Sequence, residues 1–299
     1  MQPFIEKIFP LFLAFFVGII ARQLKLLSKK DAPILLKTVL NVCLPAVAIL
    51  AINRMVLQID LIFIPISAML IVFGVYAVSK SLEKVLKLPR ATYGSFLVGT
   101  LVANSAFALP FLAASHQEQG LAMASLFDIG NSIMIFTFIY YQSVKYGDST
   151  HDGKIDWRKF LKMPPLWAFA FAFILKAFNV EFPALAVNFL ELMGSPTVPL
   201  VMISLGLYFE PSFKQLEYAL LAVLIRMGVG LALGFALSYI FGLTGLVRTV
   251  VISCSALPIG FNTLIFADIE NLDREFAATE VSISMIVAMF LIPWLIWRF

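Results

Sequence analysis

Charged residues are scarce in this sequence of 299 residues. Asp, Glu, Lys and Arg make up 13% of the chain and apolar residues 61%, whereas a soluble domain carries roughly a quarter charged residues. A water-exposed domain of this size could not hold so many apolar residues without leaving large apolar patches on its surface. The composition therefore excludes a soluble protein and predicts one whose solvent is the lipid bilayer, with no nucleic acid as a partner.

The residues and motifs of most enzymes are also missing. The two histidines, His116 and His151, fall in predicted loops, and the two cysteines, Cys43 and Cys254, fall in apolar stretches. The cysteines are therefore read as small hydrophobic residues rather than as a disulfide or metal pair. The HExxH, GxGD and GxSxG motifs and the phosphate loop of ATPases are absent. We expect neither an enzyme nor a bound cofactor, and no direct use of ATP.

Long apolar stretches are what the sequence does contain. A membrane-spanning helix needs about 20 mainly apolar residues, and ten such stretches follow one another along the chain. The predicted spans are Phe4–Ile20, Ile34–Ile52, Leu61–Val78, Phe96–Ala114, Leu121–Tyr141, Pro165–Ala177, Ala184–Phe209, Tyr218–Phe241, Val247–Ala267 and Phe276–Trp297.

The basic residues then divide between the two sides of the membrane. With ten spans, most of the Lys and Arg residues outside the spans fall in loops on one side. The other side holds Lys7, Arg54, Lys176, Arg248 and Arg298. Because cytoplasmic loops carry the excess of Lys and Arg, we expect a multi-pass protein of the inner (plasma) membrane with both termini outside.

One polar stretch, Lys145–Met163, divides the chain into five spans before it and five after it. An odd number of spans per half reverses the second half, which is the inverted repeat of many secondary transporters. Helix four carries SAFALP (Ser105–Pro110) and helix nine carries SCSALP (Ser253–Pro258). The sequence thus predicts an all-α membrane protein with repeats at 1–144 and 164–299, joined by a cytoplasmic linker at 145–163.

Prolines interrupt helices four and nine at matching places. A proline inside a helix removes a backbone donor, and in lipid such a break is tolerated where it lines a protein-enclosed cavity. We therefore expect both helices to be broken at proline and to cross, with half-helix N-termini that attract an anion. An ordinary proline kink is the alternative. The predicted substrate-binding residues are Asn41, Asn104, Ser105, Pro110, Ser255, Pro258, Gly260 and Asn262.

Ionisable residues inside the spans are the candidates for ion or proton coupling. Asp128 in helix five shares a helix face with Asn131 and Ser132, an oxygen-rich stripe that could hold a cation or a proton. Arg226 in helix eight could instead form a structural ion pair with Asp128, or meet an anionic substrate. Glu280 in helix ten is a further candidate, unless it faces cytoplasmic water.

With these residues in view, the chain resembles the auxin efflux carrier family, which includes plant auxin carriers and bacterial members linked to organic acids. The resemblance runs over nearly the whole chain and is most specific in NVCLPAVAIL, ANSAFALPFL, KMPPLWAFAFAFILKAFNVEFP, GSPTVPLVMISLGLYFEP and SALPIGFNTLIFADIENLDREFAATEVSISMIVAMFLIPW. The long central loop of many plant members is absent, which favours a prokaryotic-type or short-loop member.

The resemblance implies a scaffold of helices one, two, six and seven and a transport domain of helices three to five and eight to ten. It also implies a carboxylate substrate near the crossing, where Asn104 with Ser105 and Pro258 with Gly260 match the family. The wider fold is similar to that of the bile acid/sodium symporters, which leaves open a sodium ion at Asp128 and Asn131.

Three readings of function follow. The first is a secondary carrier for a small organic anion, and the second is a sodium or cation/proton exchanger that uses Asp128. The third, a receptor or channel, is disfavoured because the polar residues gather at the breaks instead of forming a continuous stripe. The coupling ion, sodium, proton or none, is left open, and so is a homodimer.

Overall fold

The computed structural model describes residues 2–54, 59–147, 164–209 and 215–299. Within these ranges the chain forms helices and loops, with one isolated antiparallel bridge between Ala103 and Ile259. The first half contains α1 (Gln2–Gln23), α2 (Ala32–Thr38), η1 (Val39–Cys43), α3 (Leu44–Arg54), η2 (Ile59–Ile62), α4 (Phe63–Ser81), α5 (Glu83–Leu86), α6 (Arg90–Leu101), α7 (Ser105–Met134), η3 (Ile135–Ile139) and α8 (Tyr140–Tyr146).

The second half contains α10 (Pro164–Ala177), α11 (Ala184–Gly194), α12 (Thr197–Tyr208), α13 (Leu216–Val223), η4 (Leu224–Val229), α14 (Gly230–Ile240), α15 (Gly245–Ser255), α16 (Asn262–Glu270) and α17 (Arg274–Arg298). Most of the predicted linker, residues 148–163, and with it His151, lies outside the described residues.

The helices are built for a bilayer. Among the described residues, six helical stretches are long and apolar enough to cross a membrane, and shorter apolar helices accompany them. Large apolar side chains also point outward: Phe9, Leu13 and Phe16 on one face of α1 are each more than half exposed. In water such a face would be unfavourable, whereas lipid solvates it. The predicted all-helical membrane protein is therefore confirmed.

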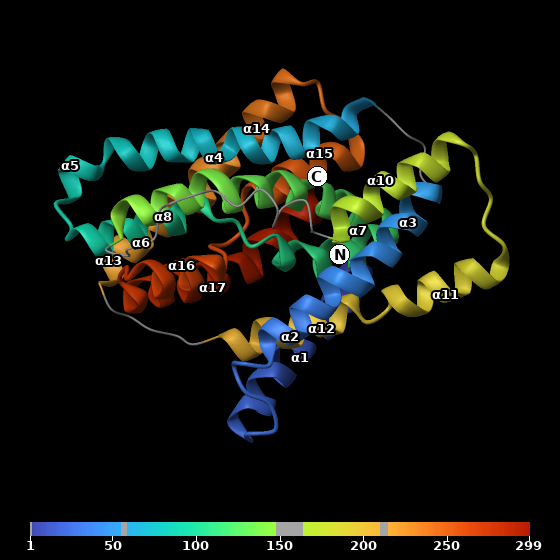
Figure 1. Cartoon of the computed structure of the whole chain (residues 1–299), viewed down its shortest axis with the longest axis horizontal. Helices are drawn as coiled ribbons and strands as arrows, with labels where there is room; N and C mark the ends of the chain where they lie inside the picture. The colour runs from blue at the N-terminus through green and yellow to red at the C-terminus, as the bar shows by residue number, and fades with distance from the viewer. Residues whose placement is uncertain (1, 55–58, 148–163, 210–214) are drawn as a thin grey trace.

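The helices fall into two groups (Figure 1). One group, along the right and lower side of the view, consists of α1, α2, α3, α10, α11 and α12. Within it α1 packs on α12, and α3 packs on α10 and α11. The other group holds α4, α6, α8 and α13 to α17, with α4 packed on α7 and α14 on α15. Helix α7 contacts both groups: it packs on α3 and α12 of the first and on α4 and α15 of the second.

Helix α7 consists of two arms. His116 (φ −128°, ψ 17°) and Gln117 (φ 51°, ψ −134°) are not helical, so the chain turns between an arm that begins at Ser105 and an arm that contains Asp128. This turn falls between the predicted spans Phe96–Ala114 and Leu121–Tyr141. Both arms carry candidate site residues toward the centre of the molecule.

Candidate functional site

Two non-helical segments from opposite halves of the chain pair through an antiparallel bridge between Ala103 and Ile259, and this pairing is called the crossing below. Helix α6 ends at Leu101 and α7 begins at Ser105, while α15 ends at Ser255 and α16 begins at Asn262. Between these ends the backbone N–H of Asn104 donates to the Pro258 carbonyl (2.9 Å), and that of Gly260 donates to the Val102 carbonyl (3.0 Å). The pairing satisfies backbone groups that would otherwise be costly to bury in a membrane.

The first interruption is not at a proline, which corrects the sequence prediction. Pro110 lies inside α7, and the helix is interrupted upstream, at residues 102–104. Pro258, by contrast, lies within the second extended segment. A proline removes one backbone donor, but it does not decide where these helices end. The helices end where the backbone of one segment forms hydrogen bonds with the other segment, whether or not a proline is present.

Side chains from neighbouring helices hold the crossing in place. The Asn131 amide, 1% exposed, donates from Nδ2 to the Ala103 carbonyl (3.0 Å) and to Ser105 Oγ (2.8 Å). On the other segment, the N–H of Ile259 donates to Ser284 Oγ (3.0 Å). Each extended segment is therefore bound both to its partner segment and to a long helix.

Arg226 binds the backbone of the second extended segment. It lies in the π-helical turn η4, is 1% exposed, and donates from Nε to the Leu257 carbonyl (3.2 Å) and from Nη2 to the Ser255 carbonyl (2.9 Å). In the described structure no ion pair joins it to Asp128. Of the readings left open for Arg226, the ion pair with Asp128 is not formed in this conformation, and the guanidinium binds carbonyl groups of the second extended segment instead.

A cavity of about 300 Å³ opens against the crossing. It is bounded by α2 and η1 on one side and by the start of α7, the arm that contains Asp128, and the start of α16 on the other. The predicted residues that line it are Asn41, Asn104, Ser105, Asp128, Asn131, Ser132, Gly260 and Asn262.

The other predicted site residues lie away from this cavity. Pro110, Ser255 and Pro258 do not line it. Neither does Arg226, which is bound to the crossing, nor Glu280, which is fully buried instead of facing cytoplasmic water. The polar residues that line the cavity are thus distinct from Arg226 and Glu280, which lie beside the crossing without lining the cavity.

Gly260 is needed for the close approach of the two segments. A Cβ atom at this position would lie 2.7 Å from Val102 Cγ1 and 3.2 Å from the Ala103 carbonyl oxygen. Any side chain would therefore push the segments apart and weaken their hydrogen bonds. The polar cavity wall depends on this glycine even though the glycine has no functional group.

Lys37 is a cavity residue that the sequence analysis did not select. Its exposed side chain lines the cavity, and it precedes Asn41 by four residues, so the two share a face of α2 and the π-helical turn η1. Its position near the N-terminal end of the predicted span Ile34–Ile52 was the signal that the sequence offered. Tyr208 and Phe261, whose rings stack at 4.1 Å, also line the cavity.

Asp128 is the acid of this cavity. Asp128 is a partly exposed residue that lines the cavity together with Ser105, Asn131 and Ser132. Hydroxyl and amide groups around a carboxylate can stabilise it or join it in binding a cation. The predicted oxygen-rich stripe therefore faces the cavity.

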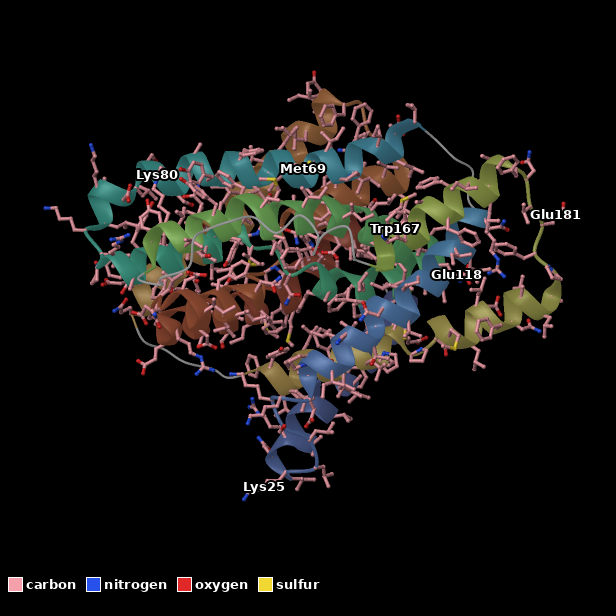
Figure 2. All side chains as sticks on the ribbon, viewed as in Figure 1. Lys25, Met69, Lys80, Glu118, Trp167 and Glu181 are labelled. Atoms are coloured by element: carbon pink, nitrogen blue, oxygen red, sulfur yellow. The ribbon has the colours of Figure 1, made fainter. Side chains whose placement is uncertain are left out.

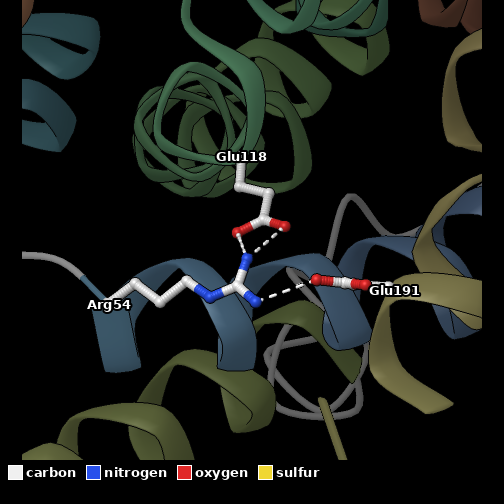
Figure 3. Close-up of polar contacts among 3 residues, drawn as sticks. All are labelled: Arg54, Glu118 and Glu191. Carbon is white, nitrogen blue, oxygen red and sulfur yellow. Dashed lines mark hydrogen bonds and ion pairs between the residues drawn. The ribbon is translucent and has the colours of Figure 1, made fainter. Parts of the chain in front are cut away.

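An ion-pair cluster links helices α3, α7 and α11. Figure 2 labels Glu118 of this cluster, and Figure 3 shows the cluster in close-up. Arg54 Nη1, at the end of α3, donates to both carboxylate oxygens of Glu118 in α7 at 2.8 Å. Its Nη2 donates to Glu191 of α11, also at 2.8 Å. Glu118 and Glu181 lie in the right part of the view in Figure 2 and Lys80 lies in the left part. The cluster thus ties the α3 and α11 group to α7.

A second cavity, of about 330 Å³, lies beside this cluster, between α3, α11 and α12 on one side and α7 on the other. Glu118 and Glu191 line it together with apolar residues such as Val47 and Leu121. Thr197 of α12 lines this second cavity and not the first.

A many-helix membrane protein in which paired helix interruptions border a polar cavity resembles membrane transporters. Comparison with known families agrees with this class. The chain belongs to the family described as "Membrane transport protein", whose model matches residues 3–296, and this is the auxin efflux carrier family. The protein is accordingly a multi-pass transporter of the cell membrane and not an enzyme.

Relatives from archaea align over almost the whole chain. An uncharacterized transporter of Methanocaldococcus jannaschii, MJ1031, is 25% identical over 288 residues, which is 92% of each chain. An uncharacterized transporter of Methanothermobacter thermautotrophicus is 24% identical over 294 residues, or 96% of each chain. Auxin efflux carrier component 1 of Arabidopsis thaliana is 28% identical over 141 residues, which cover 44% of this chain and 23% of that protein.

Proposed function

We propose that this transporter is a secondary carrier for a small organic anion, such as a dicarboxylate or an auxin-like carboxylate. The observation that carries the proposal is the composition of the cavity at the crossing. Its wall contains the N-terminal ends of α7 and α16, and the basic residue Lys37 also lines it. Helix N-termini carry partial positive charge and bind carboxylates and phosphates, so this wall favours an anion.

The proposed mechanism is alternating access. Ten membrane-spanning helices in two inverted repeats, with both termini outside, would place the crossing near the middle of the bilayer. The group of α1, α2, α3, α10, α11 and α12 would act as the scaffold, and the remaining helices as the transport domain. The cavity lies between these groups, so relative motion of the two could expose the bound anion first to one side and then to the other.

Asp128 must be neutralised for an anion to bind beside it. Like charges in a low-dielectric cavity repel strongly, so a sodium ion or a proton on the carboxylate would be a condition of anion binding. This supports coupled transport, with Asp128, Asn131 and Ser132 as the coupling site. The same oxygen-rich group supports the second candidate, a sodium or cation/proton exchanger that carries no organic anion.

Uptake into proteoliposomes tests the proposal. Labelled malonate, malate and indole acetate would be offered with and without sodium or proton gradients, to wild type and to Asp128→Asn. We expect saturable uptake of a carboxylate that a gradient accelerates in wild type. In Asp128→Asn the acceleration should be lost, because an amide cannot exchange a proton or bind a cation as a carboxylate does.

Two results would contradict the proposal. If no carboxylate moves while a sodium gradient drives proton exchange, the exchanger is the correct function. If carboxylate uptake is independent of both gradients in wild type, the protein is a uniporter and Asp128 has no coupling role. Glu217→Gln is a suitable control, because Glu217 is an exposed acid at the start of α13.

A further inference from the structure

Glu280 is a second acid inside the protein, and its setting differs from that of Asp128. It lies in α17, its exposed fraction is 0%, and it does not line the cavity. In the described structure, neither of its carboxyl oxygens has a hydrogen-bond partner. The hydrogen bonds and ion pairs that usually account for a buried acid are therefore not made by this one.

The space around the Glu280 carboxyl group is provided by a glycine. Gly99 of α6 faces it, and a Cβ atom at position 99 would overlap the carboxyl oxygen Oε1. Residues on both sides of Gly99 in α6 are buried as well. The packing of α6 on α17 thus encloses the carboxyl group completely and excludes water from it in this conformation.

This enclosed acid lies directly beside the crossing. Ser284, four residues further along α17 and so on the same face, accepts the hydrogen bond from the N–H of Ile259 in the second extended segment. Gly99 lies three residues before Val102, whose carbonyl accepts the hydrogen bond from the N–H of Gly260. Along α17, Glu280 is one helical turn from Ser284, which binds the crossing. Along α6, Gly99, which faces Glu280, is about one turn from Val102 of the crossing.

Among the residues that the structure describes, no Lys or Arg forms an ion pair with Glu280, and the buried Arg226 binds the Ser255 and Leu257 carbonyls. Asp273, at the start of α17, is the charged group that acts on Glu280, and its sign is the same. Other charged groups on helices packed against α17 are engaged elsewhere: Arg90 with the Lys145 carbonyl, Glu118 with Arg54, Asp128 with the cavity, Arg248 with the Phe299 ring and Asp268 with Arg274. Glu217 of α13 is exposed, and Glu270 of α16 lies near Tyr140.

An ionised carboxylate without a partner is far more costly to bury than a neutral carboxylic acid. We infer that Glu280 is a proton-binding site beneath the crossing, protonated in the conformation seen here, and that its proton moves together with the transported anion. The inference rests on the proposed function for the role of the proton in transport. The protonated state itself follows from the enclosure of Glu280 and does not depend on the substrate.

The geometry also gives the condition under which the proton would leave. The carboxyl group can ionise when α6 and α17 shift relative to each other enough for water to reach it, and this shift would also move the crossing. Proton release would thus be tied to one conformation of the transport site. Co-transport of one proton would cancel one negative charge of the substrate and reduce the cost of moving it through the membrane.

Infrared spectroscopy of the protein in lipid nanodiscs tests the protonated state without any substrate. The carbonyl stretch of a protonated carboxylic acid should be present at neutral pH in wild type and in Glu275→Gln. It should be reduced in Glu280→Gln, which is nearly isosteric with the wild-type side chain. Glu275 is the matched control, since it is an exposed acid at the start of the same helix. If the band is equal in Glu280→Gln and wild type, Glu280 is ionised and the inference is wrong.

Proteoliposomes that contain a pH-sensitive dye test the role in transport. Wild type and Glu275→Gln should acidify or alkalinise the lumen in step with carboxylate flux. Glu280→Gln should keep carboxylate flux within about threefold while the number of protons moved per carboxylate falls. An unchanged number of protons per carboxylate in Glu280→Gln would overturn the coupling role. If wild type moves no carboxylate, the proposed function fails, and the infrared band alone decides whether Glu280 binds a proton.

Discussion

The Arg54 cluster gives a prediction about the conformational equilibrium of the carrier. The contact between Arg54 and Glu118 joins α3 to α7, whereas the contact between Arg54 and Glu191 joins two helices of one group. If the two groups move apart during transport, the first contact must break and the second can remain. Glu118→Gln should therefore favour the conformation in which the second cavity opens, and Glu191→Gln should not.

The size of the effect follows from exposure and geometry. The Arg54 side chain is 44% exposed and that of Glu118 is 29% exposed, so solvent screens the pair. Partly exposed ion pairs contribute roughly 0.2–1 kcal/mol, and contact with both carboxylate oxygens places this one near the upper end. A loss of about 0.5–1 kcal/mol would raise the population of the open conformation roughly two- to fivefold.

A cysteine reporter in the second cavity can measure this shift. Leu121 is 7% exposed and lines that cavity, so Leu121→Cys should react slowly with a membrane-impermeant thiol reagent. The native cysteines Cys43 and Cys254 are free and buried and would be replaced by alanine. The labelling rate should rise roughly two- to fivefold with Glu118→Gln. Equal rates with Glu118→Gln and Glu191→Gln would refute the reasoning, because the contact would then not lie on a moving boundary.

Three further substitutions test the cavity and the crossing. Lys37→Gln should raise the KM for a carboxylate about tenfold, the effect of losing roughly 1.4 kcal/mol of charge-assisted binding, while Lys37→Arg keeps it low; equal uptake kinetics in all forms would remove Lys37 from the site. Asn131→Ala should lower the free energy of unfolding by about 1–2 kcal/mol, since buried groups of the crossing lose their donor; a thermal melt in nanodiscs unchanged from wild type would contradict this. Gly260→Ala should abolish transport while membrane insertion persists, because the new methyl group would meet Val102; wild-type transport would show that the close approach is dispensable.

Much of the architecture could be predicted from sequence because lipid imposes strong rules on composition. Long apolar stretches, the polar stretch near the middle and the polar residues around the helix interruptions were sufficient to predict helices, a membrane and a polar centre. Asn104, Ser105 and Asn131 were selected as polar residues in apolar spans, and all three line the cavity. Such residues are costly in lipid, which makes their presence informative.

The parts that sequence could not provide depend on three-dimensional pairing. Pro110 indicated a break that is several residues upstream, because backbone pairing between distant segments decides where a helix ends here. An ion pair with Asp128 was one of the readings left open for Arg226, and the structure shows carbonyl groups bound to its guanidinium instead. Lys37 was overlooked because a lysine near the end of an apolar stretch usually snorkels to the interface, and only the fold shows the cavity beside it.

The pairing of Ala103 with Ile259 has a consequence for biogenesis. The two segments come from opposite halves of the chain, so the first is inserted into the membrane well before its partner has been synthesised. Until then the backbone at residues 102–104 and the Asn131 amide lack part of their native environment. The newly inserted first half therefore carries unsatisfied polar groups in lipid, and we expect membrane chaperones or the insertion machinery to shield it until the last two helices arrive.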